Sequence, residues 1–351
     1  MPSITKPQIP LLPLARNELG LTLRDYAGTM STLCAGCGHD SVTAAITEAL
    51  WGLSFPPEQV AKLSGIGCSS KTPQYFDSAA VGFNSVHGRM AAVASGAAAA
   101  NRGLVMVGVS GDGDSLSIGL GNLAHAIRRN VRMLYVIANN GVYGLTKGQF
   151  SASADVGSRS RRGEPNLLPP VDPMLLGLSL GGTFLARGFS GDKAQLVPIL
   201  KAGLGHRGFA LVDVISPCVQ FNDHEGSTKS FRYVREHELQ DIEADVIPVR
   251  DQIQGEQRPG SVTEVELHDG SHVRFREVPE GYDPRDRAAV GSYLVESARR
   301  GEIATGLLYL DEQTVDMHEL NLTPDEALWD LPFERLCPGA DELASFQAKL
   351  R

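Results

Sequence analysis

Apolar and polar positions follow one another in blocks that predict a strand, a helix and a second strand in the middle of the chain. Residues 104–110 form an apolar run rich in valine, and residues 131–138 form another. Between them, residues 118–130 place apolar side chains at helical spacing and end in two arginines. Two buried strands joined by a helix lie parallel and connect in a right-handed sense. We therefore expect both strands to end at the same edge of one sheet.

The same alternation of strand and helix patterns extends from residue 33 to about residue 222, which predicts a doubly wound parallel sheet in an α/β fold. We expect an N-terminal arm over residues 1–32, the α/β domain over residues 33–228 and a C-terminal extension over residues 229–351. The arm is rich in proline, so we expect it to lie on another surface and not to fold by itself.

The C-terminal extension has a more charged and irregular composition, with three recognisable elements. Residues 262–278 alternate strictly about Asp269–Gly270, which predicts a β-hairpin. Residues 284–301 predict an amphipathic helix, and residues 306–311 predict a strand. The extension carries no recognisable catalytic set, and we expect it to wrap the core domain or a partner subunit.

The composition excludes several classes of protein. At 351 residues the chain can bury one large α/β core with an appendage, and no apolar run approaches the roughly 20 residues that span a bilayer. The proline-rich N-terminus does not fit a secretory signal, so a cytoplasmic location is expected. A net charge of −9 disfavours nucleic acid as a general partner.

Polar residues with the chemistry of a metal site follow both central strands. Asp112 comes directly after the first strand and offers a carboxylate, and Asn140 comes after the second and offers a side-chain carbonyl. The backbone carbonyl of Val142 can complete a set of oxygen ligands of the kind that Mg²⁺ takes together with phosphates. Gly111 and Gly113 permit close approach of a phosphate, and the next helix N-terminus favours negative charge. The pattern therefore predicts a magnesium diphosphate site.

Nucleotide-binding motifs and a plain tight turn fit this segment less well. Leu116 stands where the dinucleotide fingerprint needs its third glycine, and no phosphate-binding loop of the nucleotide triphosphatase type occurs. An ordinary tight turn would account for the glycines around Asp112. It would not account for the asparagine pair after the next strand.

Four of the five cysteines lie next to other motifs. Cys34 and Cys37 precede a helix that is expected to begin near Asp40 or Ser41, whereas Cys68 and Cys218 each follow a strand pattern. All four are thus expected on one rim of the sheet, where four thiolates fit either tetrahedral zinc or a [4Fe–4S] cluster. Their spacing does not choose between the two. Structural disulfides are disfavoured in a cytoplasmic chain, and Cys337 in the tail is expected to be a buried or an idle thiol.

These motifs together resemble the β subunits of the 2-oxoacid:ferredoxin oxidoreductases, which bind thiamine diphosphate. The segment that carries Asp112 and Asn140 has the strongest likeness, and the resemblance covers roughly residues 25–240. It extends through the motifs LCAGCGHDS (33–41), SGIGCSSKTPQYF (64–76), HGRMAAVASG (87–96) and ISPCVQFN (215–222). The resemblance implies a thiamine-diphosphate-binding fold with Mg²⁺, and it favours an iron–sulfur cluster over zinc.

The resemblance also implies roles for individual residues. The implied ligands of the [4Fe–4S] cluster are Cys34, Cys37, Cys68 and Cys218. The implied contacts to thiamine diphosphate are Ile66, Gly67, Cys68, Ser69, His87, Gly113, Asp114, Gly144 and Leu145. His87 would donate to a diphosphate oxygen, with helix capping as the alternative, and Asp114 could cap a helix as well.

Three lysine and arginine features bear on the substrate. Lys71 and Lys147 both lie beside cofactor motifs, so either could meet the distal carboxylate of a dicarboxylic 2-oxoacid, unless each is a solvated loop lysine. A lysine at position 147 is similar to the 2-oxoglutarate-type branch of the family. The arginines of residues 158–165 (Arg159, Arg161 and Arg162) are either solvated or available to an acidic redox partner or to coenzyme A.

The activity implied by the resemblance is oxidative decarboxylation of a 2-oxoacid to an acyl-CoA, with electrons passing through the cluster to ferredoxin. 2-Oxoglutarate is the first choice of substrate, and pyruvate or another 2-oxoacid is the alternative. The glutamate that faces the cofactor's pyrimidine comes from an α subunit in this family, so we expect the chain to work in an αβ or α₂β₂ assembly. A thiamine-dependent decarboxylase without a cluster, or a protein stapled by zinc, would each explain only part of the pattern.

Overall fold

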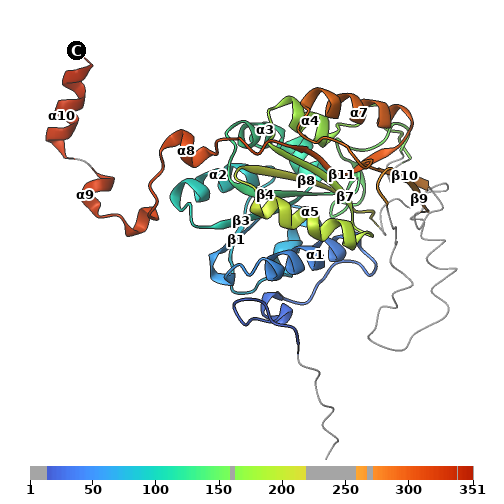
Figure 1. Ribbon diagram of the computed structural model, residues 1–351, viewed down its shortest axis with the longest axis horizontal. Coiled ribbons are helices and arrows are strands. Elements are labelled where there is room, and N and C mark those ends of the chain that lie inside the picture. The colour runs from blue at the N-terminus through green and yellow to red at the C-terminus, as the bar shows by residue number, and fades with distance from the viewer. Residues whose placement is uncertain (1–13, 159–162, 219–257, 267–271, 338, 351) are drawn as a thin grey trace, which may run out of the picture.

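The computed structural model describes residues 14–158, 163–218, 258–266, 272–337 and 339–350. These residues form a nine-stranded sheet covered by helices on both faces (Figure 1). In chain order the strands of the sheet are β1 (Val60–Ser64), β2 (Val81–Asn84), β3 (Val105–Gly111), β4 (Met133–Asn139), β7 (Phe184–Phe189), β8 (Phe209–Ile215), β9 (Val262–Glu266), β10 (His272–Glu277) and β11 (Ile303–Leu310). The order across the sheet is β2-β1-β3-β4-β8-β7-β11-β10-β9.

The first six strands across the sheet are parallel, as the sequence predicts. Strands β4, β7 and β8 are apolar along almost their whole length because helices cover both faces, so neither face meets water. Beyond β7 the sheet becomes mixed, since β11 runs antiparallel to β7. The α/β class and the doubly wound parallel sheet are therefore confirmed.

Helices from distant parts of the sequence cover each face (Figure 1). One face is covered by α1 (Gly38–Gly52) and α5 (Lys193–Gly205), which contribute Ile46, Leu50, Leu196 and Leu200 to the core. The other face is covered by α2 (Met90–Ala100), α3 (Leu120–Arg128), α4 (Pro173–Ser179) and α7 (Arg287–Arg299). The two layers hold the strand ends rigidly, which positions the loops at the carboxyl edge.

The predicted elements of the C-terminal extension are present, but they belong to the central sheet. Strands β9 and β10 form the expected antiparallel hairpin, although its turn at Asp269–Gly270 lies outside the described residues. The predicted helix is α7, capped by Asp286, and the predicted strand is β11. Because β11 pairs directly with β7, the extension completes the core sheet and is more than an appendage.

The N-terminal end of the described chain packs on the body of the protein, whereas the C-terminal end extends away from it (Figure 1). Near the N-terminus, the short helix η1 (Leu23–Tyr26) packs on α1: the Tyr26 hydroxyl donates to Phe55 O at 2.7 Å and Trp51 Nε1 donates to Leu21 O at 3.0 Å. Beyond α8 (Met317–Asn321) the chain runs away from the body (Figure 1). This tail contains η6 (Leu328–Asp330), α9 (Phe333–Leu336) and α10 (Ala340–Lys349).

The remaining short elements lie at both edges of the sheet. η2 (Pro57–Gln59) precedes β1 at the edge opposite the predicted site. Close to the predicted site are η3 (Ser69–Gln74), the π-helical turn η4 (Gly113–Ile118), and the two-stranded hairpin of β5 (Val142–Tyr143) and β6 (Gln149–Phe150). None of the helices within the described residues has both the length and the apolar character needed to cross a membrane.

Candidate active site

The two polar segments predicted to meet at one sheet edge do meet there. Strands β3 and β4 are parallel neighbours, with Gly111 opposite Ala138, so Asp112 and Asn140 follow adjacent strand ends. The backbone N–H groups of Asn140 and Gly141 donate to the Asp112 carboxylate at 3.3 and 3.1 Å. The loop after β4 is therefore folded around the carboxylate that follows β3.

The Asp112 carboxylate is almost completely buried, with 1% of its residue surface exposed. The hydroxyls of Ser151 and Ser153 also donate to its Oδ2 atom, Ser153 at 2.5 Å. Burial raises the pKa of Asp112, and the hydrogen bonds from the serines and from the Asn140 backbone oppose that rise. No ion pair to Asp112 occurs within the described residues, so a divalent cation would supply the positive charge that this buried carboxylate lacks. The donor set therefore fits Mg²⁺.

The segment after Asn140 is a small hairpin, where the sequence suggested only a loop. Asn140 Oδ1 accepts from Val142 N at 3.1 Å, which starts the turn into β5. The Tyr143 hydroxyl donates to Gly113 O at 3.0 Å and ties the hairpin to the turn that follows β3. Of the predicted cofactor contacts on this hairpin, Gly144 is buried and Leu145 is exposed.

Asp114 is a second buried carboxylate, and protein groups surround it. It accepts from Gly88 N at 2.8 Å, from Ser110 Oγ at 2.7 Å and from Ile66 N at 3.3 Å. These bonds tie the loop after β1 and the turn before α2 to the end of β3. The predicted cofactor contacts Ile66, Gly67 and Ser69 are thus held beside the Asp112 turn through Asp114.

The four predicted cluster ligands lie on the same rim, as expected from the strand ends they follow. Cys34 and Cys37 precede α1, Cys68 follows β1 and Cys218 follows β8. Burial raises the pKa of Cys34, Cys37 and Cys68, that of Cys37 to about 12. The Cys218 thiol raises all three pKa values further, which shows that the four thiols are electrostatic neighbours. Within the described residues, no three His, Cys, Asp or Glu side chains are placed to hold a single metal ion.

The start of helix α1 is packed tightly against the ends of β7 and β8. Helix α1 begins at Gly38, slightly before the predicted position near Asp40, and a Cβ at Gly38 would lie 2.6 Å from the hydroxyls of Ser190 and Ser216. His39 is buried and its Nδ1 lies 2.7 Å from Ser216 Oγ. This packing joins the loop of Cys37 to the loop of Cys218, which are far apart in the sequence.

The predicted cationic residues occupy different positions around this edge. Lys71 is partly buried and lies close enough to Cys34 and Cys68 that its charge opposes the rise in both pKa values. Lys147 is exposed on the turn of the small hairpin, in a left-handed backbone conformation with φ of 76°. His87 is exposed in the turn before α2, and Arg89 occupies the N-cap position, so His87 does not cap that helix.

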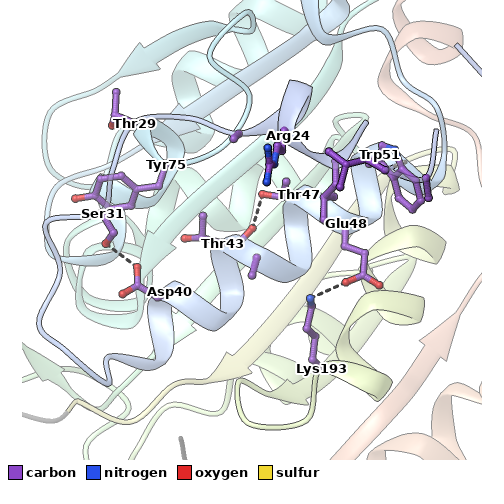
Figure 2. A pocket seen from close by; sticks show the side chains of 15 residues that line it. Arg24, Thr29, Ser31, Asp40, Thr43, Thr47, Glu48, Trp51, Tyr75 and Lys193 are labelled. Atoms are coloured by element: carbon purple, nitrogen blue, oxygen red, sulfur yellow. Dashed lines mark hydrogen bonds and ion pairs between the residues drawn. The ribbon is translucent and has the colours of Figure 1, made fainter. Parts of the chain in front are cut away.

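A cavity of about 790 Å³ lies elsewhere, between the N-terminal segment and the outer side of α1 (Figure 2). Its walls include Leu23, Trp51 and Tyr75, together with an ion pair between Lys193 and Glu48 at 2.6 Å. Ser31 donates to Asp40 at 2.6 Å at another part of the wall. None of the predicted site residues lines this cavity, so its size does not mark the catalytic edge.

Known proteins are similar to this chain over the segments that form the edge. Residues 65–214 match the family model of the thiamine pyrophosphate enzymes, C-terminal TPP binding domain. The 2-oxoglutarate synthase subunit KorB of Methanothermobacter thermautotrophicus is 32% identical over 211 residues, which cover 59% of this chain and 73% of that subunit. The 2-oxoacid:ferredoxin oxidoreductase subunit beta of Saccharolobus solfataricus is 40% identical over 191 residues, 54% of this chain.

The chain belongs to the β subunits of the 2-oxoacid:ferredoxin oxidoreductases.

A solved structure supports the same assignment. A chain of the 2-oxoglutarate:ferredoxin oxidoreductase from Magnetococcus marinus, with 2-oxoglutarate, coenzyme A and succinyl-CoA bound, superposes with a TM-score of 0.71 at 28% identity. The superposition covers 95% of this β subunit and 98% of that chain. The sequence match to the Saccharolobus subunit spans only 63% of that protein's length.

The structure also reveals polar residues of this β subunit that sequence reasoning missed. Ser151 and Ser153 contact Asp112, and Asn139, Arg187 and Asp213 lie behind them. A sequence signal existed for the last two, because each is a charged residue inside an apolar strand. The arginines Arg159, Arg161 and Arg162 lie outside the described residues.

Proposed function

We propose that this β subunit, together with an α subunit, oxidatively decarboxylates a 2-oxoacid to an acyl-CoA and passes two electrons through a [4Fe–4S] cluster to ferredoxin. The observation that carries the proposal is the placement of a buried, cation-deficient Asp112 and of four neighbouring thiols on loops at one edge of the sheet. Such an edge is where ligands bind in open α/β sheets.

The residues that would hold Mg²⁺ are Asp112, Asn140 through its side chain and Val142 through its backbone carbonyl. The diphosphate would lie against the turn that begins at Gly113, where backbone N–H groups at the start of η4 favour negative charge. Thiamine diphosphate supplies an electron sink for breaking the bond between the 2-oxo carbon and the carboxylate. In this arrangement His87, exposed in the turn before α2, would donate to a diphosphate oxygen.

The family of this chain supports a cluster over zinc. Its relative from Saccharolobus solfataricus is named a 2-oxoacid:ferredoxin oxidoreductase subunit, and an iron–sulfur cluster can carry electrons to a ferredoxin whereas zinc cannot. Cys34, Cys37, Cys68 and Cys218 influence one another's charge, as neighbouring ligands of one cluster would. A cluster at this place would give electrons a route out of the site.

The choice of 2-oxoglutarate rests on the two lysines and on the named relatives. A dicarboxylic substrate needs a second cation for its distal carboxylate. Lys71 lies near the Cys34 and Cys68 thiols, and Lys147 lies on the turn of the small hairpin that follows Asn140. The Methanothermobacter relative is named a 2-oxoglutarate synthase subunit, and the Magnetococcus enzyme holds 2-oxoglutarate and succinyl-CoA. Pyruvate is the second choice.

The partner in this proposal is an α subunit that supplies the glutamate facing the cofactor's pyrimidine. The C-terminal tail is evidence for a partner surface, because many of its apolar side chains are exposed to solvent. Those at least 60% exposed include Trp329, Phe333, Phe346 and Leu350. Apolar surface of this extent is a mark of a protein interface.

The test is an anaerobic assay of the co-purified αβ complex with several 2-oxoacids, coenzyme A and a viologen dye, together with iron and sulfide analysis. The proposal predicts dye reduction that requires both coenzyme A and a 2-oxoacid, and about four irons per β subunit. Decarboxylation without dye reduction would identify a non-redox thiamine enzyme instead. Zinc in place of iron would contradict the cluster.

A further inference from the structure

A continuous chain of hydrogen bonds leads from Asp112 across the sheet, and it involves residues that the proposed reaction does not use. Ser153 Oγ lies 2.5 Å from Asp112 Oδ2 and 2.9 Å from Asn139 Oδ1. Asn139 Nδ2 donates to Asp213 Oδ1 at 3.1 Å, and Arg187 Nε donates to Asp213 Oδ2 at 2.7 Å. The far end is fixed because Arg187 also donates to Asp172, the N-cap residue of α4, at 2.9 Å.

The three central members of this chain are buried and come from three adjacent strands, whereas Ser153 and Asp172 on either side of them are partly buried loop residues. Asn139 ends β4, Asp213 lies in β8 and Arg187 lies in β7, directly opposite Asp213 in the parallel pairing. Their exposed fractions are 9%, 0% and 6%. Burying charged groups in this way is costly unless they pair, and a buried pair contributes little stability compared with apolar residues of the same size. The pair therefore calls for a role other than holding the fold.

The direction of each hydrogen bond follows from the Arg187–Asp213 pair. Burial raises the pKa of Asp213, and the Arg187 guanidinium opposes that rise by favouring the ionised form. An ionised Asp213 accepts hydrogen bonds only, which is why Asn139 turns its amide nitrogen toward it. The carbonyl oxygen of Asn139 then faces Ser153. The Ser153 hydroxyl has one hydrogen and three oxygens within reach: Asp112 Oδ2, Asn139 Oδ1 and, at 3.1 Å, Ser151 Oγ. Ser151 gives its own hydroxyl hydrogen to Asp112, so the alternative acceptor for the Ser153 hydrogen that leads into the network is Asn139.

We infer that Ser153, Asn139 and Asp213 are positioning residues that prepare Asp112 to bind Mg²⁺, an inference that rests on the proposed function. Without a cation, the Ser153 hydroxyl satisfies the buried Asp112 carboxylate. When a cation takes over that charge, the same hydroxyl turns to Asn139 and remains hydrogen bonded. Asp112 can thus exchange a hydroxyl donor for a metal without leaving a buried polar group unpaired.

The charges of the network are unevenly compensated. Asp172 and Asp213 both pair with Arg187, whereas Asp112 is joined to Asp213 only through Ser153 and Asn139 and has no ion pair within the described residues. A cation at Asp112 would therefore meet a carboxylate whose charge Arg187 does not offset. Groups that orient a metal ligand in this way commonly change metal affinity by about 10-fold to 100-fold when they are removed.

The experiment measures Mg²⁺ binding by calorimetry, at saturating thiamine diphosphate, to the co-purified αβ complex after removal of both. Ser153→Ala and Asp213→Asn should each raise the Kd for Mg²⁺ about 10-fold or more. Ser153→Thr keeps the hydroxyl and should stay near the parent value. Ser179→Ala on α4 is the matched control, since its hydroxyl bonds only Leu175 O among the described residues and lies outside the network.

Combined variants and melting temperatures separate positioning from folding. Because both side chains act through one chain of bonds, the double variant should bind Mg²⁺ no more than about threefold more weakly than the worse single variant. Ser153 is a small loop residue, so Ser153→Ala should melt within a few degrees of the parent even if Asp213→Asn unfolds.

Two outcomes would overturn the inference in different ways. If the parent complex binds Mg²⁺ and thiamine diphosphate but Ser153→Ala and Asp213→Asn both stay within twofold of its Kd, the inference alone is wrong. If the parent complex binds neither, the proposed function is wrong and this inference falls with it.

Discussion

The ring of Tyr143 occupies the space that a side chain at position 113 would need. A Cβ at Gly113 would lie 2.4 Å from Tyr143 Cε1, and the Tyr143 hydroxyl donates to Gly113 O at 3.0 Å. The glycine that follows Asp112 is thus explained by the aromatic side chain of the neighbouring loop as well as by the approach of a phosphate. This contact links the Asp112 turn to the small hairpin that carries Lys147.

Gly113→Ala should therefore destabilise the protein, by about 1–3 kcal/mol, because the methyl group overpacks a closed contact. Gly121→Ala is the matched control: it lies in α3 with no atom within 4 Å of its Cβ position, and it should stabilise by roughly 0.5–1 kcal/mol. Chemical denaturation of both variants measures the change in the free energy of unfolding, which should have opposite signs in the two. Equal effects of the two alanines would contradict the role assigned to Tyr143.

The cysteines give a second prediction, on metal content. Replacing Cys34, Cys37, Cys68 or Cys218 by serine should lower the iron and sulfide content of the anaerobically purified complex and bleach its visible absorbance. Cys337→Ser should leave both unchanged, because Cys337 is exposed in the tail at the end of α9. Loss of iron in the Cys337 variant, or its retention in the Cys218 variant, would exclude the proposed ligand set.

Substrate preference tests the lysines. Lys147→Ala should lower kcat/KM for 2-oxoglutarate about 10-fold to 100-fold, the effect of losing a hydrogen-bonded ion pair, while kcat/KM for pyruvate changes little. Lys71→Ala is expected to act in the same direction. The control is Lys349→Ala in α10, far along the tail. If both variants keep the parent's ratio of the two rates, the lysines do not select the dicarboxylate.

A pH-dependent stability is predicted from His206. Its Nε2 lies 2.8 Å from Thr183 Oγ1, and burial lowers its pKa from 6.5 to about 4. The unfolded chain therefore binds a proton between these values that the folded chain does not, so stability is lost as pH falls from about 6.5 toward 4. His206→Gln removes this titration, and its melting temperature should fall less than the parent's between pH 7 and pH 5. Parallel pH profiles would contradict the prediction.

The tail gives the last prediction, on assembly. Residues 311–351 contain ten acidic and three basic residues, a net charge of −7 out of the chain's −9, and many of their apolar side chains are exposed. Ending the chain after residue 331 removes α9 and α10, which contribute no buried residue to the core, and keeps Asp325, which pairs with Arg102, and the buried Ala327. The shortened β subunit should keep its melting temperature but co-purify with less α subunit, most clearly at high salt. Undiminished co-purification would assign the tail another role.

The strand ends explain why much of the site was predictable from sequence. Parallel strands place their carboxyl ends at one edge, so Asp112, Asn140 and the four cysteines could be assigned to one rim from the sequence alone. The sequence pattern also marked the central strands β3 and β4, since each is an apolar run that ends in a polar loop. Local chemistry and strand direction were sufficient for these residues.

The network behind Asp112 was not predictable, because it depends on the order of strands across the sheet. Asp213 and Arg187 each interrupt an apolar strand, which signals a buried charge, but only the adjacency of β7 and β8 shows that they pair. Asn139 is the neighbour of the predicted ligand Asn140, but its side chain hydrogen bonds to Asp213 and Ser153. Ser153 follows a hairpin too short to be recognised from periodicity.

The antiparallel pairing of β11 with β7 has a consequence for how the protein is made. Until Ile303–Leu310 has left the ribosome, β7 has an open side whose N–H and C=O groups lack their final partner. Cys218 is the last of the predicted metal ligands to be synthesised, and β11 begins more than eighty residues later. During that interval β7 lacks its antiparallel neighbour. We expect chaperones or the partner subunit to protect that edge during synthesis, and fragments that stop before residue 303 to aggregate.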